Sequence, residues 1–192
     1  MILPSSLKGA GGYSLWIIPA GKTYEKLVRI IDELSKRYST PVFEPHVTVV
    51  KNIKLPEQEM IAKTSQLAAA LSPYAVILIG LEVSMKFYTN LVAKADKTHE
   101  LMEASRKARQ IFCQHQLHPY DPHLSLIYGN LSRSATQRIS KNIKEQIQGV
   151  IFQARSIHVV VTAGRPENWR RIKELPFDNI HVTSSELLAS HL

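Results

Sequence analysis

The chain has 192 residues, of which 44% are hydrophobic, and its 24 lysines and arginines against 16 aspartates and glutamates give a formal charge of +8. This composition excludes a disordered or membrane-embedded protein, because no apolar run approaches the roughly 20 residues of a spanning helix. The positive charge favours an anionic partner such as a nucleotide or RNA, although the basic residues are spread along the chain rather than grouped in one block.

The first twelve residues, MILPSSLKGAGG, show no pattern of a secretory signal or an Arg-rich transit peptide. We therefore expect a cytosolic or nuclear protein with no membrane partner. We also expect a monomer. Cys113 is the single cysteine of the chain and cannot form an internal disulfide. It falls on the apolar face of a predicted helix, which is typical of a small packing residue rather than of a nucleophile.

Strands and helices alternate along the chain, as judged from hydrophobic periodicity and β-propensity. In chain order we predict a strand at 13–18, a helix at 24–38, a strand at 43–50, a helix at 56–71, strands at 74–83 and 90–95, a helix at 101–115, a strand at 120–127, a helix at 134–149, and strands at 151–160 and near 170–175. The Ser-rich segment 178–192 is predicted to be a mobile tail.

Two segments of the chain match residue type by residue type. They are FEPHVTVV at 43–50 and YDPHLSLI at 120–127, each reading aromatic, acid, Pro, His, aliphatic, hydroxyl, aliphatic, aliphatic. The two histidines, His46 and His123, are 77 positions apart, and the flanking predicted elements recur at the same offset. The sequence therefore contains a duplicated unit.

The repeat predicts an α+β fold in one two-lobed domain spanning 1–192, with approximate twofold symmetry. We expect lobe 1 at about 13–83 and lobe 2 at about 90–176, joined by residues 84–89, with an antiparallel sheet and two helices in each lobe. The paired motifs should meet in a cleft between the lobes.

The motifs carry residues suited to acid–base chemistry on a phosphate. Because side chains alternate along a strand, His46 and Thr48 share a face, as do His123 and Ser125, while the intervening aliphatic residues point into the core. One imidazole can accept a proton from water and the other can donate one to a leaving oxygen, while the two hydroxyls bind the non-bridging oxygens. We predict catalytic roles for both histidines and substrate-binding roles for both hydroxyls.

A single His-x-Thr strand is most often a buried strand whose histidine is simply hydrogen bonded, but two copies in identical local context favour the catalytic interpretation. Since such a motif offers one ligand where a zinc site needs more, we predict neither a metal nor a cofactor. Tyr128, Phe87 and Tyr88 are candidates to stack on a base or ribose, and are equally plausible as core aromatics. Glu44 and Asp121 are candidates to orient a histidine, or simply solvated turn acids.

The stretches PVFEPHVTVV and YDPHLSLIYGN resemble the two signature motifs of the plant and fungal cyclic phosphodiesterases, within the two-histidine phosphoesterase family. The resemblance covers nearly the whole chain and implies that His46 and His123 are the catalytic histidines and that Thr48 and Ser125 bind phosphate. The motifs are nearly interchangeable, so the sequence does not say which histidine is the base; analogy favours His123 as base and His46 as acid.

The resemblance also implies a reaction: hydrolysis of ADP-ribose 1'',2''-cyclic phosphate to ADP-ribose 1''-phosphate, and of nucleoside 2',3'-cyclic phosphates to 2'-phosphates, downstream of tRNA splicing. Two alternatives stay open. One is an RNA-end 2',3'-cyclic phosphodiesterase or ligase-like relative, which the basic charge would suit. The other is a non-catalytic nucleotide- or RNA-binding module, which would not need both histidines.

Overall fold

The computed structural model describes residues 12–114 and 119–178. Within these residues lie four α-helices, two short 3-10 helices and eight strands, in the order β1 (Tyr13–Ile17), α1 (Gly21–Tyr38), β2 (Val47–Ile53), α2 (Glu57–Ala69), β3 (Tyr74–Val83), η2 (Phe87–Thr89), β4 (Leu91–Ala95), α3 (His99–Ile111), β5 (His123–Ile127), α4 (Arg133–Ile147), β6 (Ile151–Ala154), β7 (Ser156–Val161), η3 (Pro166–Asn168) and β8 (Arg170–Pro176). The predicted α+β class is confirmed. Beyond Asp178, the predicted tail lies outside the residues that the structure describes.

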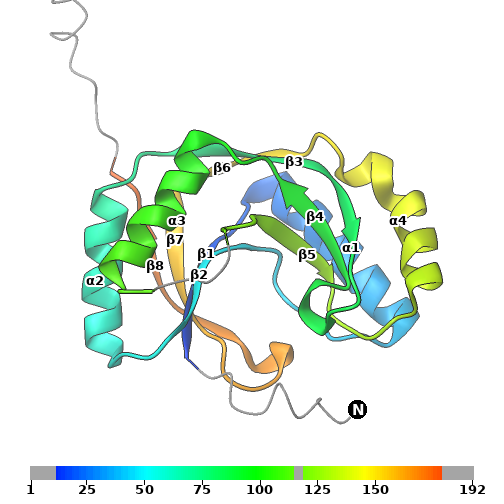
Figure 1. Cartoon of the computed structure of the whole chain (residues 1–192), viewed down its shortest axis with the longest axis horizontal. Helices are drawn as coiled ribbons and strands as arrows, with labels where there is room; N and C mark the ends of the chain where they lie inside the picture. Colours follow the sequence, from blue (N-terminus) through cyan, green and yellow to red (C-terminus); the bar gives the residue numbers. More distant parts are fainter. Residues whose placement is uncertain (1–11, 115–118, 179–192) are drawn as a thin grey trace, which may run out of the picture.

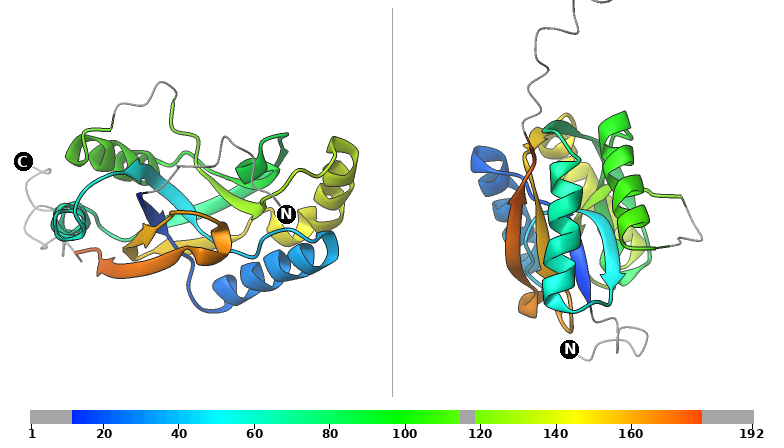
Figure 2. Two further views of the ribbon diagram at one scale, coloured as in Figure 1. Left: turned by 90° about the horizontal axis from the view of Figure 1, so that it is seen from below. Right: turned by 90° about the vertical axis from the view of Figure 1, so that its left-hand side faces the viewer.

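The strands form one curled antiparallel sheet in the order β6-β3-β4-β5-β2-β1-β7-β8 (Figure 1). Helices α2 and α3 cover one end of it, where α2 packs on β7 and β8 and α3 packs on β2. At the other end α4 packs on β3 and β4 and α1 packs on β5. The right-hand view of Figure 2 shows α2 and α3 side by side.

Strand pairing crosses the lobe boundary that the repeat predicts. Strand β3, from the first copy, pairs with β4 and β6, whereas β7 and β8, from the second copy, extend the sheet beyond β1. The reason is the short connection at 84–90, closed by a hydrogen bond from Ser84 N to Asn90 O, which makes β3 and β4 a hairpin. One half of the sheet is therefore β6-β3-β4-β5 and the other is β2-β1-β7-β8, and each half contains strands from both copies of the repeat. The division into 13–83 and 90–176 follows the repeat but not the strand pairing.

The predicted strand 151–160 is two strands. It divides at Arg155, so that β6 pairs with β3 in one half of the sheet and β7 pairs with β1 in the other. This segment therefore runs from one half to the other and ties them together.

The core lies between the helices and one face of the sheet. Val47, Val49, Leu124 and Leu126 are all buried there, as the alternation in the two motifs predicts. Apolar faces of all four helices reach the same cluster, through residues such as Leu27, Met60, Leu101 and Ile139. Burial of side chains of this size contributes about 1.5–3 kcal/mol each, so the core fixes the positions of β2 and β5.

One helix boundary was wrong. The predicted helix 101–115 ends at Ile111, and Cys113 adopts a left-handed φ of 50° in the turn that follows. Its side chain is exposed rather than packed. The turn ends the helix because the amide groups of Cys113 and Gln114 bond back to the carbonyls of Gln110 and Arg109. Among the described residues, no helix combines the length and apolar character needed to cross a membrane.

Candidate active site

The two motifs lie on adjacent strands at the centre of the sheet. Val47 of β2 pairs with Leu124 of the antiparallel strand β5. This register places His46 across from Ser125 and Thr48 across from His123. Each histidine therefore faces the hydroxyl of the other motif, and the polar face of this strand pair is opposite the buried face that carries the aliphatic residues.

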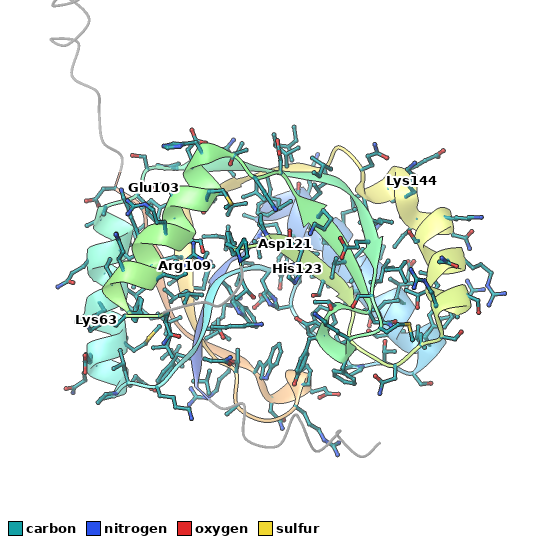
Figure 3. The ribbon with its side chains drawn as sticks, viewed as in Figure 1. Lys63, Glu103, Arg109, Asp121, His123 and Lys144 are labelled. Atoms are coloured by element: carbon teal, nitrogen blue, oxygen red, sulfur yellow. The ribbon has the colours of Figure 1, made fainter. Side chains whose placement is uncertain are left out.

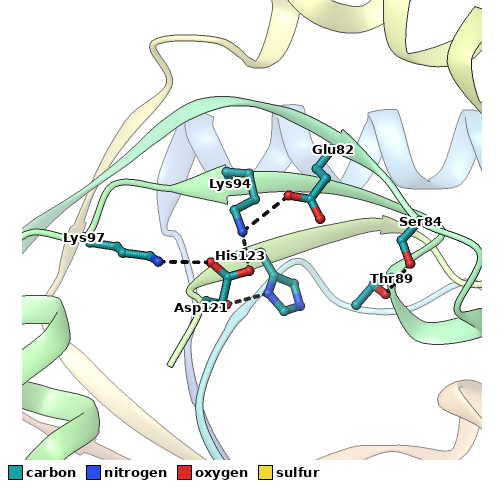
Figure 4. Close-up of polar contacts among 7 residues, drawn as sticks. All are labelled: Glu82, Ser84, Thr89, Lys94, Lys97, Asp121 and His123. Carbon is teal, nitrogen blue, oxygen red and sulfur yellow. Dashed lines mark hydrogen bonds and ion pairs between the residues drawn. The ribbon is translucent and has the colours of Figure 1, made fainter. Parts of the chain in front are cut away.

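Both imidazole rings are held in the same way. Nδ1 of His46 lies 2.7 Å from the carbonyl oxygen of Glu44, and Nδ1 of His123 lies 2.8 Å from that of Asp121 (Figure 4). Since a carbonyl only accepts hydrogen bonds, Nδ1 carries the proton in each neutral ring, and Nε2 is left to exchange a proton with a substrate. The two copies of the motif therefore hold their histidines in the same tautomer.

The carboxylates of Glu44 and Asp121, two positions before the histidines, bind side chains of other elements. The Glu44 carboxylate accepts a hydrogen bond from the Tyr24 hydroxyl at 2.9 Å and pairs with Arg171 at 3.2 Å. The Asp121 carboxylate pairs with Lys94, and Figure 3 places Asp121 and His123 near the centre of the molecule. These contacts hold the segments whose carbonyls bind the rings, so both acids orient the histidines through their main chains.

Burial disfavours the charged form of both rings. The His46 side chain is 5% exposed, and burial lowers its pKa to about 3. Burial also lowers the pKa of His123, with a further contribution from the Lys94 ammonium. The two imidazoles also repel each other when charged, which lowers the pKa of His46 further. Both rings are therefore neutral near pH 7 in the unliganded protein.

The two hydroxyls differ in their present partners. Ser125 is 5% exposed, and its hydroxyl donates to the carbonyl oxygen of Tyr88 at 3.0 Å. Thr48 is half-buried, and its main-chain oxygen accepts from the Tyr120 hydroxyl at 2.9 Å. Within the described residues the Thr48 hydroxyl makes no hydrogen bond. It can therefore form a hydrogen bond with a ligand without breaking one that it already makes.

The three predicted aromatic residues differ in how deeply they are buried. Tyr128 is 4% exposed and stacks on Phe43, with ring centroids 3.7 Å apart. Its ring therefore belongs to the core. Phe87 is half-buried, and its ring meets that of Tyr88 edge-on at 5.1 Å. Tyr88 in turn contacts Tyr128 at 5.3 Å, so these rings join η2 to the end of β5.

Two tryptophans near the motifs were missed from the sequence. Trp16 stacks on His46 with ring centroids 3.5 Å apart and planes 7° apart, and Trp169 meets Trp16 edge-on at 5.7 Å. Neither tryptophan recurs in the repeat, so the comparison of the two copies does not find them. The available signal was the alternation in β1, which puts Ser14, Trp16 and Ile18 on one face.

Donor sets for a metal are absent from the part of the chain that the structure describes: no three or more His, Cys, Asp or Glu side chains gather there.

Comparison with known proteins identifies relatives of this chain. The family described as cyclic phosphodiesterase-like protein matches residues 11–177. A cyclic phosphodiesterase of Arabidopsis thaliana is 27% identical over 134 residues, which cover 70% of this chain and 72% of that protein. A 2',3'-cyclic-nucleotide 3'-phosphodiesterase of Candida albicans is 27% identical over 118 residues, covering 53% of this chain and about half, 48%, of that protein.

Among solved structures, that of LigT from E. coli in its apo form has a TM-score of 0.62 at 11% identity, covering 86% of this chain and 96% of that one. At this identity the likeness shows a shared fold, which is that of the two-histidine phosphoesterases.

Proposed function

Because the chain belongs to the cyclic phosphodiesterase-like family and is thereby a hydrolase of cyclic phosphodiesters, we propose the substrates and the mechanism that its site serves. The substrates are ADP-ribose 1'',2''-cyclic phosphate and nucleoside 2',3'-cyclic phosphates, and the reaction uses His46 and His123 without a metal. In this proposal the enzyme acts on products of tRNA splicing.

The observation that carries the proposal is the crossed arrangement of the two motifs. With His46 across from Ser125 and Thr48 across from His123, one phosphate centred on the strand pair would have a histidine on either side and a hydroxyl beside each histidine. Such a set supplies a base, an acid and two donors to the non-bridging oxygens. A non-catalytic binding module would not need two rings with matching tautomers.

The proposed reaction is an in-line displacement at phosphorus. One imidazole takes a proton from water at Nε2 while the water oxygen bonds to phosphorus. The bond between phosphorus and the sugar 3'-oxygen breaks, and the second imidazole gives that oxygen its proton. The product is a 2'-phosphate, and the two histidines have exchanged protonation states. Solvent restores them.

The surroundings of the rings support a direction for this transfer. His46 is the more deeply buried ring and has the lower pKa, so it is the better candidate for the neutral base, while His123 is the candidate acid. This reverses the order that analogy favours. A bound phosphate would stabilise the imidazolium of His123 by its negative charge.

The name of the Candida albicans relative supports the product. A 3'-phosphodiesterase breaks the bond to the 3'-oxygen, and that cleavage of a 2',3'-cyclic phosphate leaves the phosphate on the 2'-oxygen. The Arabidopsis thaliana relative is a cyclic phosphodiesterase and supports the wider substrate class.

The test is a panel of substrates assayed with EDTA present: ADP-ribose 1'',2''-cyclic phosphate, the four nucleoside 2',3'-cyclic phosphates and a short RNA ending in a 2',3'-cyclic phosphate. The proposal expects turnover of the small substrates and no turnover by His46→Ala or His123→Ala. Preference for the RNA by a hundredfold or more would favour the RNA-end alternative. Binding of all substrates with no hydrolysis would favour the binding module.

A second substrate assigns the two histidines. In a cyclic phosphate whose 3'-oxygen is replaced by sulfur, the leaving thiolate needs no proton, because a thiol has a pKa of about 8.5. We expect this substrate to restore turnover to His123→Ala and not to His46→Ala. Rescue of His46→Ala alone would exchange the two roles.

A further inference from the structure

The two histidines have matching motifs but different neighbours. Trp16 is the register partner of Thr48 on β1, and Val92 is the register partner of Ser125 on β4, so these two residues occupy corresponding places beside the motifs. Only the first is aromatic. Its indole lies parallel to the His46 ring with 3.5 Å between centroids. In the described part of the chain, no ring stacks on His123 in this way.

Trp16 is itself firmly held. It is 3% exposed, lies on a central strand between β2 and β7, and packs with Ile18 and Val160. The edge of Trp169 meets it at 5.7 Å and 62°. Moving the indole would disrupt these contacts, so it is a rigid surface for the ring that lies on it.

The His46 ring is therefore constrained in two independent ways. The carbonyl of Glu44 holds Nδ1 at 2.7 Å, and the indole covers one face and fixes the plane. Together these leave Nε2 as the proton-exchanging atom at a set position. A ring held in this way does not need to search for its reactive orientation during turnover.

We propose that Trp16 is a positioning residue for His46, which fixes the plane of the imidazole and stabilises it electrostatically while it carries the transferred proton. This inference rests on the proposed function. The π face of an indole attracts a cation, and a desolvated pair of this kind changes an equilibrium by about thirtyfold. Because the resting ring is neutral, the attraction acts mainly in the transition state, where it raises kcat.

The charged and titratable groups around His46 come from several elements. His123 faces it from β5, and the Glu44 carboxylate, bound by Tyr24 of α1 and Arg171 of β8, lies on the segment before it. All of them persist when Trp16 is replaced. A change in the protonation of His46 in such a variant is therefore caused by loss of the indole.

The experiment compares Trp16→Leu and Trp16→Phe with the control Val92→Ala. Kinetics are measured across pH on two substrates: a nucleoside 2',3'-cyclic phosphate and a simple cyclic phosphate that has no base. We expect Trp16→Leu to lower kcat by about 10- to 100-fold on both substrates, with KM within about threefold of wild type. Trp16→Phe keeps a π face and should lose only a few-fold. Val92→Ala should keep the wild-type pH profile.

Nuclear magnetic resonance provides a readout that needs no substrate. Spectra of the imidazole groups should show sharp His46 signals in wild type and exchange-broadened His46 signals in Trp16→Leu, because only the Glu44 hydrogen bond then restrains the ring, with the His123 signals unchanged in both. A rise in KM limited to the substrate with a base would mean that Trp16 contacts substrate instead, and would overturn the proposal. So would equal losses in the Leu and Phe variants, or His46 signals that stay as sharp in Trp16→Leu as in wild type. Failure of the proposed function would differ from these results, since wild type itself would then be inactive.

Discussion

The Thr48 hydroxyl allows a sharp test of how the phosphate is held, because Thr48→Val removes the hydroxyl and keeps the β-branched shape. In the described residues this hydroxyl makes no hydrogen bond, whereas the Ser125 hydroxyl donates to the carbonyl of Tyr88 at 3.0 Å. The two hydroxyls therefore start from different states. Thr48 loses nothing on binding a phosphate, and Ser125 must give up a bond.

The magnitude follows from that difference. A hydrogen bond to a charged group contributes about 1.5–3 kcal/mol, so Thr48→Val should lower kcat/KM by about 10- to 150-fold. A neutral hydrogen bond contributes about 0.5–1.5 kcal/mol, so the net loss in Ser125→Ala should be smaller by about 2- to 10-fold. Thr48→Ser keeps the hydroxyl and should stay within a few-fold of wild type.

The assay is steady-state hydrolysis of adenosine 2',3'-cyclic phosphate with EDTA, together with thermal unfolding of each variant to show that the fold is intact. If Thr48→Ser were as damaging as Thr48→Val, the methyl group rather than the hydroxyl would be the operative part. If Ser125→Ala cost more than Thr48→Val at equal stability, the comparison of the two hydroxyls would be wrong.

Three other predictions can be checked in parallel. His46→Ala and His123→Ala should each lower kcat by about a hundredfold or more with unchanged circular dichroism, since each removes a proton-transfer group; near wild-type turnover in either would refute the two-histidine mechanism. Activity should survive chelation, and kcat/KM should follow a bell-shaped pH profile with its maximum below pH 6.5, because burial lowers the pKa of both rings, so the acid loses its proton below pH 6.5 and the base gains one at lower pH; restoration of a chelated enzyme by zinc or magnesium would contradict this. Tyr74→Phe should raise the free energy of unfolding by about 1 kcal/mol, because the Tyr74 hydroxyl is buried and has no hydrogen-bond partner among the described residues; a lower free energy of unfolding in a denaturant titration would contradict this.

Much of the site could be predicted from the sequence, because its two halves are local and repeated. Alternation along a strand places His46 with Thr48 and His123 with Ser125, and it places Val47 and its counterparts in the core, where the structure has them. These relations involve residues one or two positions apart, so they do not depend on how the chain folds over longer distances. The alternating pattern also predicted the α+β class and most of the helix and strand positions.

Only the tertiary structure decided which strands lie side by side. The division at Arg155 and the hairpin of β3 with β4 exchange strands between the two halves, and hydrophobic periodicity carries no information about such pairings. For the same reason, the sequence did not predict the neighbours that make the surroundings of the two histidines different. Trp16 lies 30 positions before His46, and Arg171 lies 127 positions after Glu44. They meet only because β1, β7 and β8 follow β2 in that order across the sheet, so that pairing between strands rather than proximity in the chain determines what each imidazole contacts.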